Sequence, residues 1–125
     1  MTLLLDTHAL LWWLDDNPLL SRSALEALAD AGTIVFVSPV SVWEVAIKEN
    51  VGKLSVPPDW IEKVEASHLK PMPITLQHGR LAGSLPLHHR DPFDRMLVAQ
   101  AMAEGLTIVT RDPRIARYGV PTLRA

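Results

Sequence analysis

Three short apolar runs in the chain have the pattern of strands that are buried on both faces. They are residues 2–5, 33–37 and 107–110, and the last two are rich in β-branched side chains. Two weaker strands are expected at 72–74 and 121–123. Between these runs, apolar residues recur at helical spacing. This periodicity predicts helices over residues 9–14, 21–31, 39–50, 59–68, 76–84 and 92–104.

The expected helix ends carry residues suited to them. Gly32 and Gly105 lie where a left-handed cap is expected, and Pro39 and Pro92 suit a first helical turn. Helices that alternate with buried strands predict right-handed crossovers and a mainly parallel sheet with helices on both sides. The expected fold is therefore a three-layer α/β domain. In such sheets, function concentrates beyond the carboxyl ends of the strands.

Composition narrows the class of protein. With 125 residues, 48% hydrophobic and 21% charged, the chain is expected to form one folded domain over residues 1–125. It has no Cys, which excludes a disulfide framework, a thiolate metal centre and a cysteine nucleophile. No apolar run is long enough for a membrane helix, and the first residues are unlike a signal peptide, so a cytoplasmic protein is expected. The net charge of -2 excludes a global basic field, so any polyanion must be bound locally.

Two aspartates follow predicted strands at the edge where chemistry is expected. Asp6 ends the first run, and Asp112 follows the 107–110 run after Arg111. Both side chains should therefore lie at the carboxyl edge of the sheet. Each could equally be the N-cap of the next helix, a position that Asp favours.

Two further acids interrupt apolar helix faces. Glu44 shares a face with Val40, Ile47 and Val51. It could instead belong to a capping box that starts at Ser41, although Ser38 and Pro39 form the better helix start.

Asp94 likewise precedes Leu97, Val98 and Ala101 on one face. The alternative for this segment is a capped first turn, with Asp91 as N-cap, Pro92 at the first position and Asp94 favoured by the helix dipole.

Convergence of four carboxylates would need compensation. At separations of about 5 Å and an effective dielectric of about 20, each pair repels by roughly 3 kcal/mol, and all pairs together by about 20, more than the stability of a typical domain. Protonation with raised pKa values is one escape. Divalent cations are the other, and an all-oxygen site suits Mg²⁺ or Mn²⁺ better than zinc or copper. Such ions also reverse the local field, so that a phosphodiester could bind.

Four segments of the chain together resemble the PIN domain, in particular the VapC-type toxins of bacterial toxin–antitoxin pairs. They are DTHALLWWL at 6–14, SVWEVAIK at 41–48, HRDPFDRMLVAQA at 89–101 and TRD at 110–112. Their order and spacing match the family, and the resemblance extends from Thr2 to about Leu123.

The resemblance implies a metal-dependent endoribonuclease in which Asp6, Glu44, Asp94 and Asp112 surround one or two Mg²⁺ or Mn²⁺ ions, with Asp91 as the alternative to Asp94. A metal-activated water would hydrolyse the RNA phosphodiester and leave a 5′-phosphate. Thr110 fills a place where family members often carry Ser or Thr, or is an ordinary strand residue. Implied partners are an RNA substrate, a cognate antitoxin and a second copy of the chain.

Several other residues have two interpretations. His88, His89, Arg90 and Arg111 could contact phosphates at the rim of the site or could lie in solvated loops. His8 could contact metal or substrate, but a partly buried histidine at a helix start is favoured. Trp13 and Trp43 are expected in the core.

Rival functions differ in what they require. A structure-specific DNA nuclease would have a similar acidic site but needs segments that clamp a duplex. A phosphate-accepting receiver needs a lysine opposite its aspartate, which the lysines here fit poorly. A PIN-like module that only binds a partner would not need the full acidic set.

Overall fold

A five-stranded parallel sheet forms the centre of the computed structural model, which describes residues 1–125. Its order is β3-β2-β1-β4-β5, and every neighbouring pair is parallel. The strands are β1 (Thr2–Leu5), β2 (Ile34–Val37), β3 (Lys70–Pro71), β4 (Thr107–Thr110) and β5 (Thr122–Arg124).

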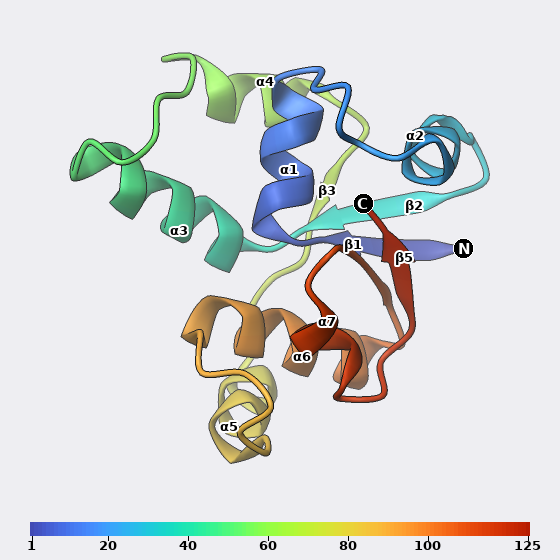
Figure 1. Cartoon of the computed structure of the whole chain (residues 1–125), viewed down its shortest axis with the longest axis vertical. Coiled ribbons are helices and arrows are strands. Elements are labelled where there is room, and N and C mark those ends of the chain that lie inside the picture. The colour runs from blue at the N-terminus through green and yellow to red at the C-terminus, as the bar shows by residue number, and fades with distance from the viewer.

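Helices cover both faces of this sheet (Figure 1). On one side lie α1 (Thr7–Leu14), α2 (Arg22–Ala29) and α4 (Trp60–Ala66). On the other lie α5 (Leu76–Ser84), α6 (Pro92–Glu104) and the short α7 (Pro113–Ala116), while α3 (Pro39–Asn50) leads away from the end of β2. The expected three-layer α/β fold is confirmed. None of the helices combines the length and apolar character that a bilayer-spanning segment requires.

The alternation of side chains along β1 divides the core into two parts. Leu3 and Leu5 belong to the apolar cluster beneath α1 and α2, whereas Leu4 belongs to the cluster beneath α6 and α7. All three leucines are fully buried. An uninterrupted apolar run is what a central parallel strand needs, because both of its faces are covered.

Proline displaces one predicted strand. The strand expected at 72–74 lies instead at Lys70–Pro71. The Met72 N–H still donates to the Val37 carbonyl at 2.9 Å, but Pro71 and Pro73 have no N–H, so the pairing stops there. Short edge strands are also the least sharply marked by sequence.

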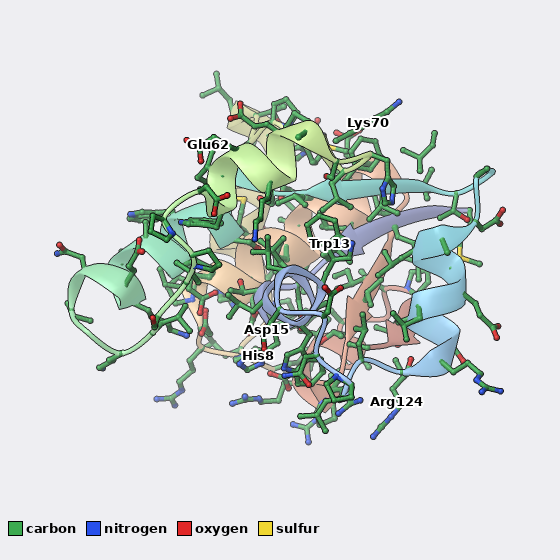
Figure 2. The ribbon with its side chains drawn as sticks, turned by 90° about the horizontal axis from the view of Figure 1, so that it is seen from above. His8, Trp13, Asp15, Glu62, Lys70 and Arg124 are labelled. Carbon is green, nitrogen blue, oxygen red and sulfur yellow. The ribbon has the colours of Figure 1, made fainter.

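Three aromatic side chains on the surface helices differ in burial. Trp13 and His8 leave α1 on different sides (Figure 2). Trp13 packs against the core as expected, but His8 is exposed, so the prediction of a partly buried histidine is wrong. The expectation for Trp43 is also wrong, because 61% of it is exposed. Its ring contacts Phe93 edge-on at 5.2 Å, outside the closed core.

Candidate metal centre

The carboxyl edge of the sheet gathers the acids that the sequence singled out. β1 and β4 are neighbours, so Asp6 and Asp112, which follow them, leave the sheet side by side. The helix α6 precedes β4 and must run back across the sheet, which places its N-terminal turn, with Asp94, at the same edge.

A pocket of about 170 Å³ lies at this edge. All four predicted acids line it, although they come from positions far apart in the chain. The remaining lining residues are mostly polar or charged. The full lining is Asp6, Thr7, His8, Trp12, Glu44, Lys48, Asp91, Asp94, Arg111, Asp112, Arg114 and Ala125.

Three of the aspartates also cap helices. Asp6 Oδ1 accepts the Ala9 N–H at 2.8 Å, and Asp112 Oδ1 accepts the Arg114 N–H at 2.9 Å. Asp91 Oδ1 accepts two N–H groups at the start of α6, including that of Asp94 at 3.1 Å. Capping and pocket lining therefore coexist in one residue, because a cap occupies only part of a carboxylate's accepting capacity. Asp94 itself caps nothing.

Glu44 enters the pocket from the second turn of α3. Ser38 is the N-cap of that helix and Pro39 is its first residue, so the alternative of a capping box at Ser41 is wrong. Glu44 is buried, and its Oε1 accepts the Thr7 hydroxyl at 2.6 Å. Its Oε2 accepts the Lys48 ammonium at 2.8 Å, one turn further along the helix. The hydrogen bond to Glu44 raises the pKa of Lys48.

The apolar face expected around Glu44 is only partly buried. Val40 lies in the core, but Ile47 is 38% exposed and Val51 58% exposed. The reason is that α3 runs beyond the end of the sheet (Figure 1). On α6, by contrast, Leu97 and Val98 are fully buried, as expected.

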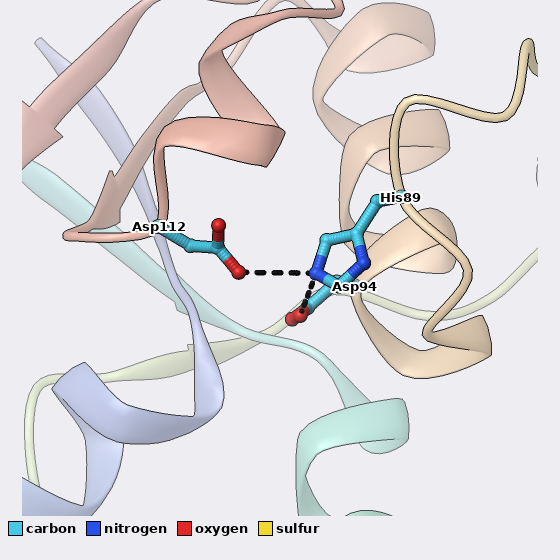
Figure 3. Close-up of side chains that lie close together, drawn as sticks. All are labelled: His89, Asp94 and Asp112. Atoms are coloured by element: carbon cyan, nitrogen blue, oxygen red, sulfur yellow. Dashed lines mark hydrogen bonds and ion pairs between the residues drawn. The ribbon is translucent and has the colours of Figure 1, made fainter.

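His89 lies between two of the acids (Figure 3). Its Nε2 is 3.0 Å from Asp112 Oδ2, to which it is hydrogen-bonded, and 2.9 Å from Asp94 Oδ2. Potential ligand atoms of these three residues all lie within 4.8 Å of one another. The expectation that His89 lies at the rim or in a solvated loop is wrong, since only 5% of it is exposed.

The acids of the pocket differ in pKa. Burial raises the pKa of Asp6 against the effect of hydrogen bonds from Thr110 and Ala9. Burial, followed by repulsion from Asp91 and Asp6, raises the pKa of Asp94 to about 7. Burial alone would also raise the pKa of Asp112, but hydrogen bonds from the Arg114 side chain and backbone outweigh it and lower that pKa.

Thr110 ends β4 beside these acids. Its hydroxyl oxygen accepts the Asp112 N–H at 3.0 Å, which shapes the turn that carries Asp112. It also hydrogen-bonds to Asp6 and lowers the pKa of that group. The residue is buried in the strand and contacts the site, so the two interpretations of Thr110 hold together.

Basic residues line the pocket only in part. The Arg114 guanidinium contacts both oxygens of Asp112, each at 3.0 Å. Arg111 turns to the Ala125 carbonyl at 2.7 Å and stacks over the Trp12 ring at 4.5 Å. Arg95, beside Asp94 in sequence, points elsewhere and donates to the carbonyl groups of Ala82, Leu85, Pro86 and His89.

Sequence reasoning missed Thr7, Lys48 and Arg114, which line this pocket, and it named His89 only as a rim or loop residue. Thr7 binds Glu44, and Lys48 could have been found from its spacing of four residues after Glu44. His89 gave a weaker signal. It precedes the Asp91-Pro92 helix start by two residues, and only the fold places its ring between Asp94 and Asp112.

The residues of the pocket fit a divalent cation. Asp6, Glu44, Asp94 and Asp112 offer carboxylate oxygens, the ligands that Mg²⁺ and Mn²⁺ prefer. Mutual repulsion among these acids contributes to the high pKa of Asp94, which is the electrostatic stress that a cation relieves.

Known proteins share this architecture. Ribonuclease VapC22 from Mycobacterium tuberculosis (strain ATCC 25618 / H37Rv) is 31% identical over 124 residues, which cover 96% of this chain and 94% of that protein. The VapBC2 structure from Rickettsia felis, bound to a promoter DNA fragment, has a TM-score of 0.74 at 19% identity and covers 98% of both chains. The DNA-bound VapBC structure from Salmonella typhimurium has a TM-score of 0.70 at 19% identity and covers 98% of this chain and 97% of its own. Because residues 3–121 match the PIN domain, this chain belongs to the PIN domain family.

Proposed function

We propose that this chain is a divalent-metal-dependent endoribonuclease that acts as the toxin of a toxin–antitoxin pair. One observation carries the proposal: Asp6, Glu44, Asp94 and Asp112, far apart in the chain, line one pocket at the carboxyl edge of the sheet. Membership of the PIN domain family and the 31% identity to Ribonuclease VapC22 support RNA as the substrate.

The four acids have a common role in this proposal, which is to hold Mg²⁺ or Mn²⁺. Both Asp91 and Asp94 line the pocket, but Asp94 is preferred because its carboxylate oxygen lies within 4.8 Å of potential ligand atoms of His89 and Asp112, a group that does not include Asp91. A cation held by these four residues would supply an activated water for in-line attack on phosphorus and stabilisation of the charge that develops there.

Two positively charged side chains at the pocket rim could bind a polyanion. Lys48 and Arg114 each contact one of the acids and keep an exposed surface of 43% and 56%. In a chain with a net charge of -2, these two groups and the cation supply the local field that holds a phosphodiester. We assign them to substrate binding and not to proton transfer.

The partners follow from the solved relatives. Both structures described above are VapBC complexes, so we propose a cognate antitoxin as partner of this chain. The resemblance to VapC-type toxins further leads us to propose that the antitoxin covers this pocket and that the toxin is a cytoplasmic homodimer. The supporting likeness extends over nearly the whole chain in each case.

A cleavage assay tests the function. The purified chain should cut RNA with Mg²⁺ or Mn²⁺, stop when EDTA is added, leave 5′-phosphate ends and spare duplex DNA of the same sequence. Asp6→Asn should abolish cleavage, whereas Asp59→Asn, at an exposed aspartate that makes no side-chain cap, should not. Products with 2′,3′-cyclic phosphates, or cleavage that survives EDTA, would contradict the mechanism.

A growth assay separates the toxin role from nuclease activity in general. Expression of the chain without a partner should arrest growth, and Asp6→Asn should relieve the arrest. Equal arrest by both proteins would assign the toxicity to another part of the molecule.

A further inference from the structure

His89 is buried, and hydrogen bonds from other elements hold its backbone. It lies in the loop between α5 and α6, yet only 5% of it is exposed. Its backbone N–H donates to the Tyr118 hydroxyl at 3.0 Å, and the Arg95 guanidinium donates to its carbonyl at 3.2 Å. These hydrogen bonds hold the backbone of His89 in place, and burial of the side chain restricts rotation of the imidazole ring.

The contacts of the ring determine which nitrogen carries the proton. Nδ1 lies 3.3 Å from the Asp91 backbone N and accepts its N–H, an arrangement that assigns a single ring hydrogen to Nε2. Nε2 then carries the hydrogen and acts as a donor, which agrees with the two carboxylate oxygens that lie against it. A metal ion could bind Nε2 only if this hydrogen moved to Nδ1, where it would face the Asp91 N–H.

We propose that His89 is a positioning residue that sets the spacing of the Asp94 and Asp112 carboxylates for metal binding, and that it is neither a metal ligand nor a phosphate contact. The proposal rests on the proposed function, since it takes Asp94 and Asp112 as metal ligands. A single N–H donates to Asp112 and presents its positive edge to Asp94, so the two carboxylate oxygens are held close together before a cation arrives.

A second histidine in the chain uses the same arrangement without a role in the pocket. His78 is 1% exposed, its Nδ1 accepts the Thr75 N–H at 3.0 Å, and its Nε2 is 2.9 Å from Glu104 Oε1. Glu104 lies at the far end of α6 and is 42% exposed. His78 is thus a matched control for the effect of removing a buried, carboxylate-bound imidazole.

Two substitutions separate the functions of the two ring nitrogens. In His89→Asn, the amide oxygen can replace Nδ1 as acceptor of the Asp91 N–H, but no donor reaches Asp94 or Asp112. In His89→Gln, the longer amide can replace Nε2 as donor, but the loop contact is lost. We expect His89→Asn to weaken Mn²⁺ binding about 10- to 100-fold in calorimetric titration, the usual loss for a residue that orients metal ligands. His89→Gln should restore most of the affinity, and His78→Asn should leave it unchanged.

Other results would overturn the positioning role. Wild-type affinity in His89→Asn would do so while leaving the proposed function intact. Equal losses in His89→Asn and His89→Gln would do so as well, because they indicate a ligand or a purely structural residue. If the wild-type chain binds no Mn²⁺, the proposed function and the positioning role fall together.

Two spectroscopic measurements on the wild-type chain need no variant. In the metal-free protein, ¹⁵N NMR at a pH where imidazole is neutral should show His89 with an unprotonated Nδ1 and a protonated Nε2. A protonated Nδ1 would overturn the proposal. In the Mn²⁺-loaded protein, electron spin echo spectroscopy should show no directly bound histidine nitrogen. Strong coupling to such a nitrogen would make His89 a ligand and overturn the proposal.

Discussion

Two helices that both begin with Asp-Pro bring acids to the pocket, and the pKa values of these acids shift in opposite directions. α6 begins with Asp91-Pro92 and α7 with Asp112-Pro113, and in both the aspartate is the N-cap. On α7, Arg114 turns back onto the acid and the pKa of Asp112 falls. On α6, Arg95 turns away to backbone carbonyl groups, and the pKa of Asp94 rises to about 7.

The difference shows that a basic residue next to an acid in the sequence does not by itself compensate the charge of that acid. Arg95 follows Asp94 directly but lies on another side of the helix, because adjacent residues are about 100° apart around the axis. Its guanidinium fixes the chain between α5 and α6 and leaves Asp94 uncompensated. A bound cation would therefore relieve more electrostatic stress at Asp94 than at Asp112.

The largest expected effect comes from removing the uncompensated acid. Asp94→Asn should lower Mn²⁺-dependent RNA cleavage by about 100-fold or more, because it removes one of the four proposed charged ligands. Asp91→Asn should cost much less, since Asn caps a helix about as well as Asp. Cleavage rates of the two variants under equal metal concentration provide the comparison. The reverse order would make Asp91 the ligand and Asp94 the dipole-favoured residue of the first turn.

An intermediate effect is expected on stability as pH changes. The pKa of Asp94 is raised in the folded chain from 3.8 to about 7, so the folded state binds the proton more tightly than the unfolded state. The metal-free protein should therefore lose stability as pH rises from about 4 to about 7 and then level off, by about 2 kcal/mol for this group, with allowance for its partial contact with water.

Thermal unfolding of the wild type and of Asp94→Asn isolates this contribution. The difference between their melting temperatures should grow in favour of the variant as pH rises through that range. Excess Mn²⁺ should remove the trend in the wild type, because the cation binds the ionised form. A difference that is independent of pH would show that Asp94 is not under electrostatic stress.

The layers of the fold and the position of the four acids at one edge of the sheet could be predicted from local features of the sequence. Leu3, Leu4 and Leu5 form an apolar run because both faces of the central strand β1 are covered. Asp6 directly follows β1, and Asp112 follows β4 after Arg111. Once the strands and their parallel order are predicted, the edge at which these acids meet follows from topology.

The directions of long side chains could not be predicted in the same way. Whether Arg95 or Arg114 compensates an acid depends on which carbonyl groups and carboxylates lie within reach after folding. The burial of His89 likewise results from contacts with Tyr118, 29 residues away. Trp43, expected in the core, is exposed because α3 extends past the sheet that would have covered it.

The smallest expected effect comes from releasing the compensated acid. Arg114 occupies both oxygens of Asp112 and so competes with a cation for them. Arg114→Ala should therefore tighten Mn²⁺ binding by about two- to fivefold in low salt, the range expected for an exposed ion pair, and the gain should shrink as salt rises. Arg117→Ala removes the same charge from an exposed position three residues further along and serves as the control.

Calorimetric titration that gives equal gains for both variants would assign the effect to overall charge and not to the contact. Weaker binding in Arg114→Ala would mean that Arg114 orients Asp112 for the cation, and the contrast between α6 and α7 would then lie in geometry and not in charge.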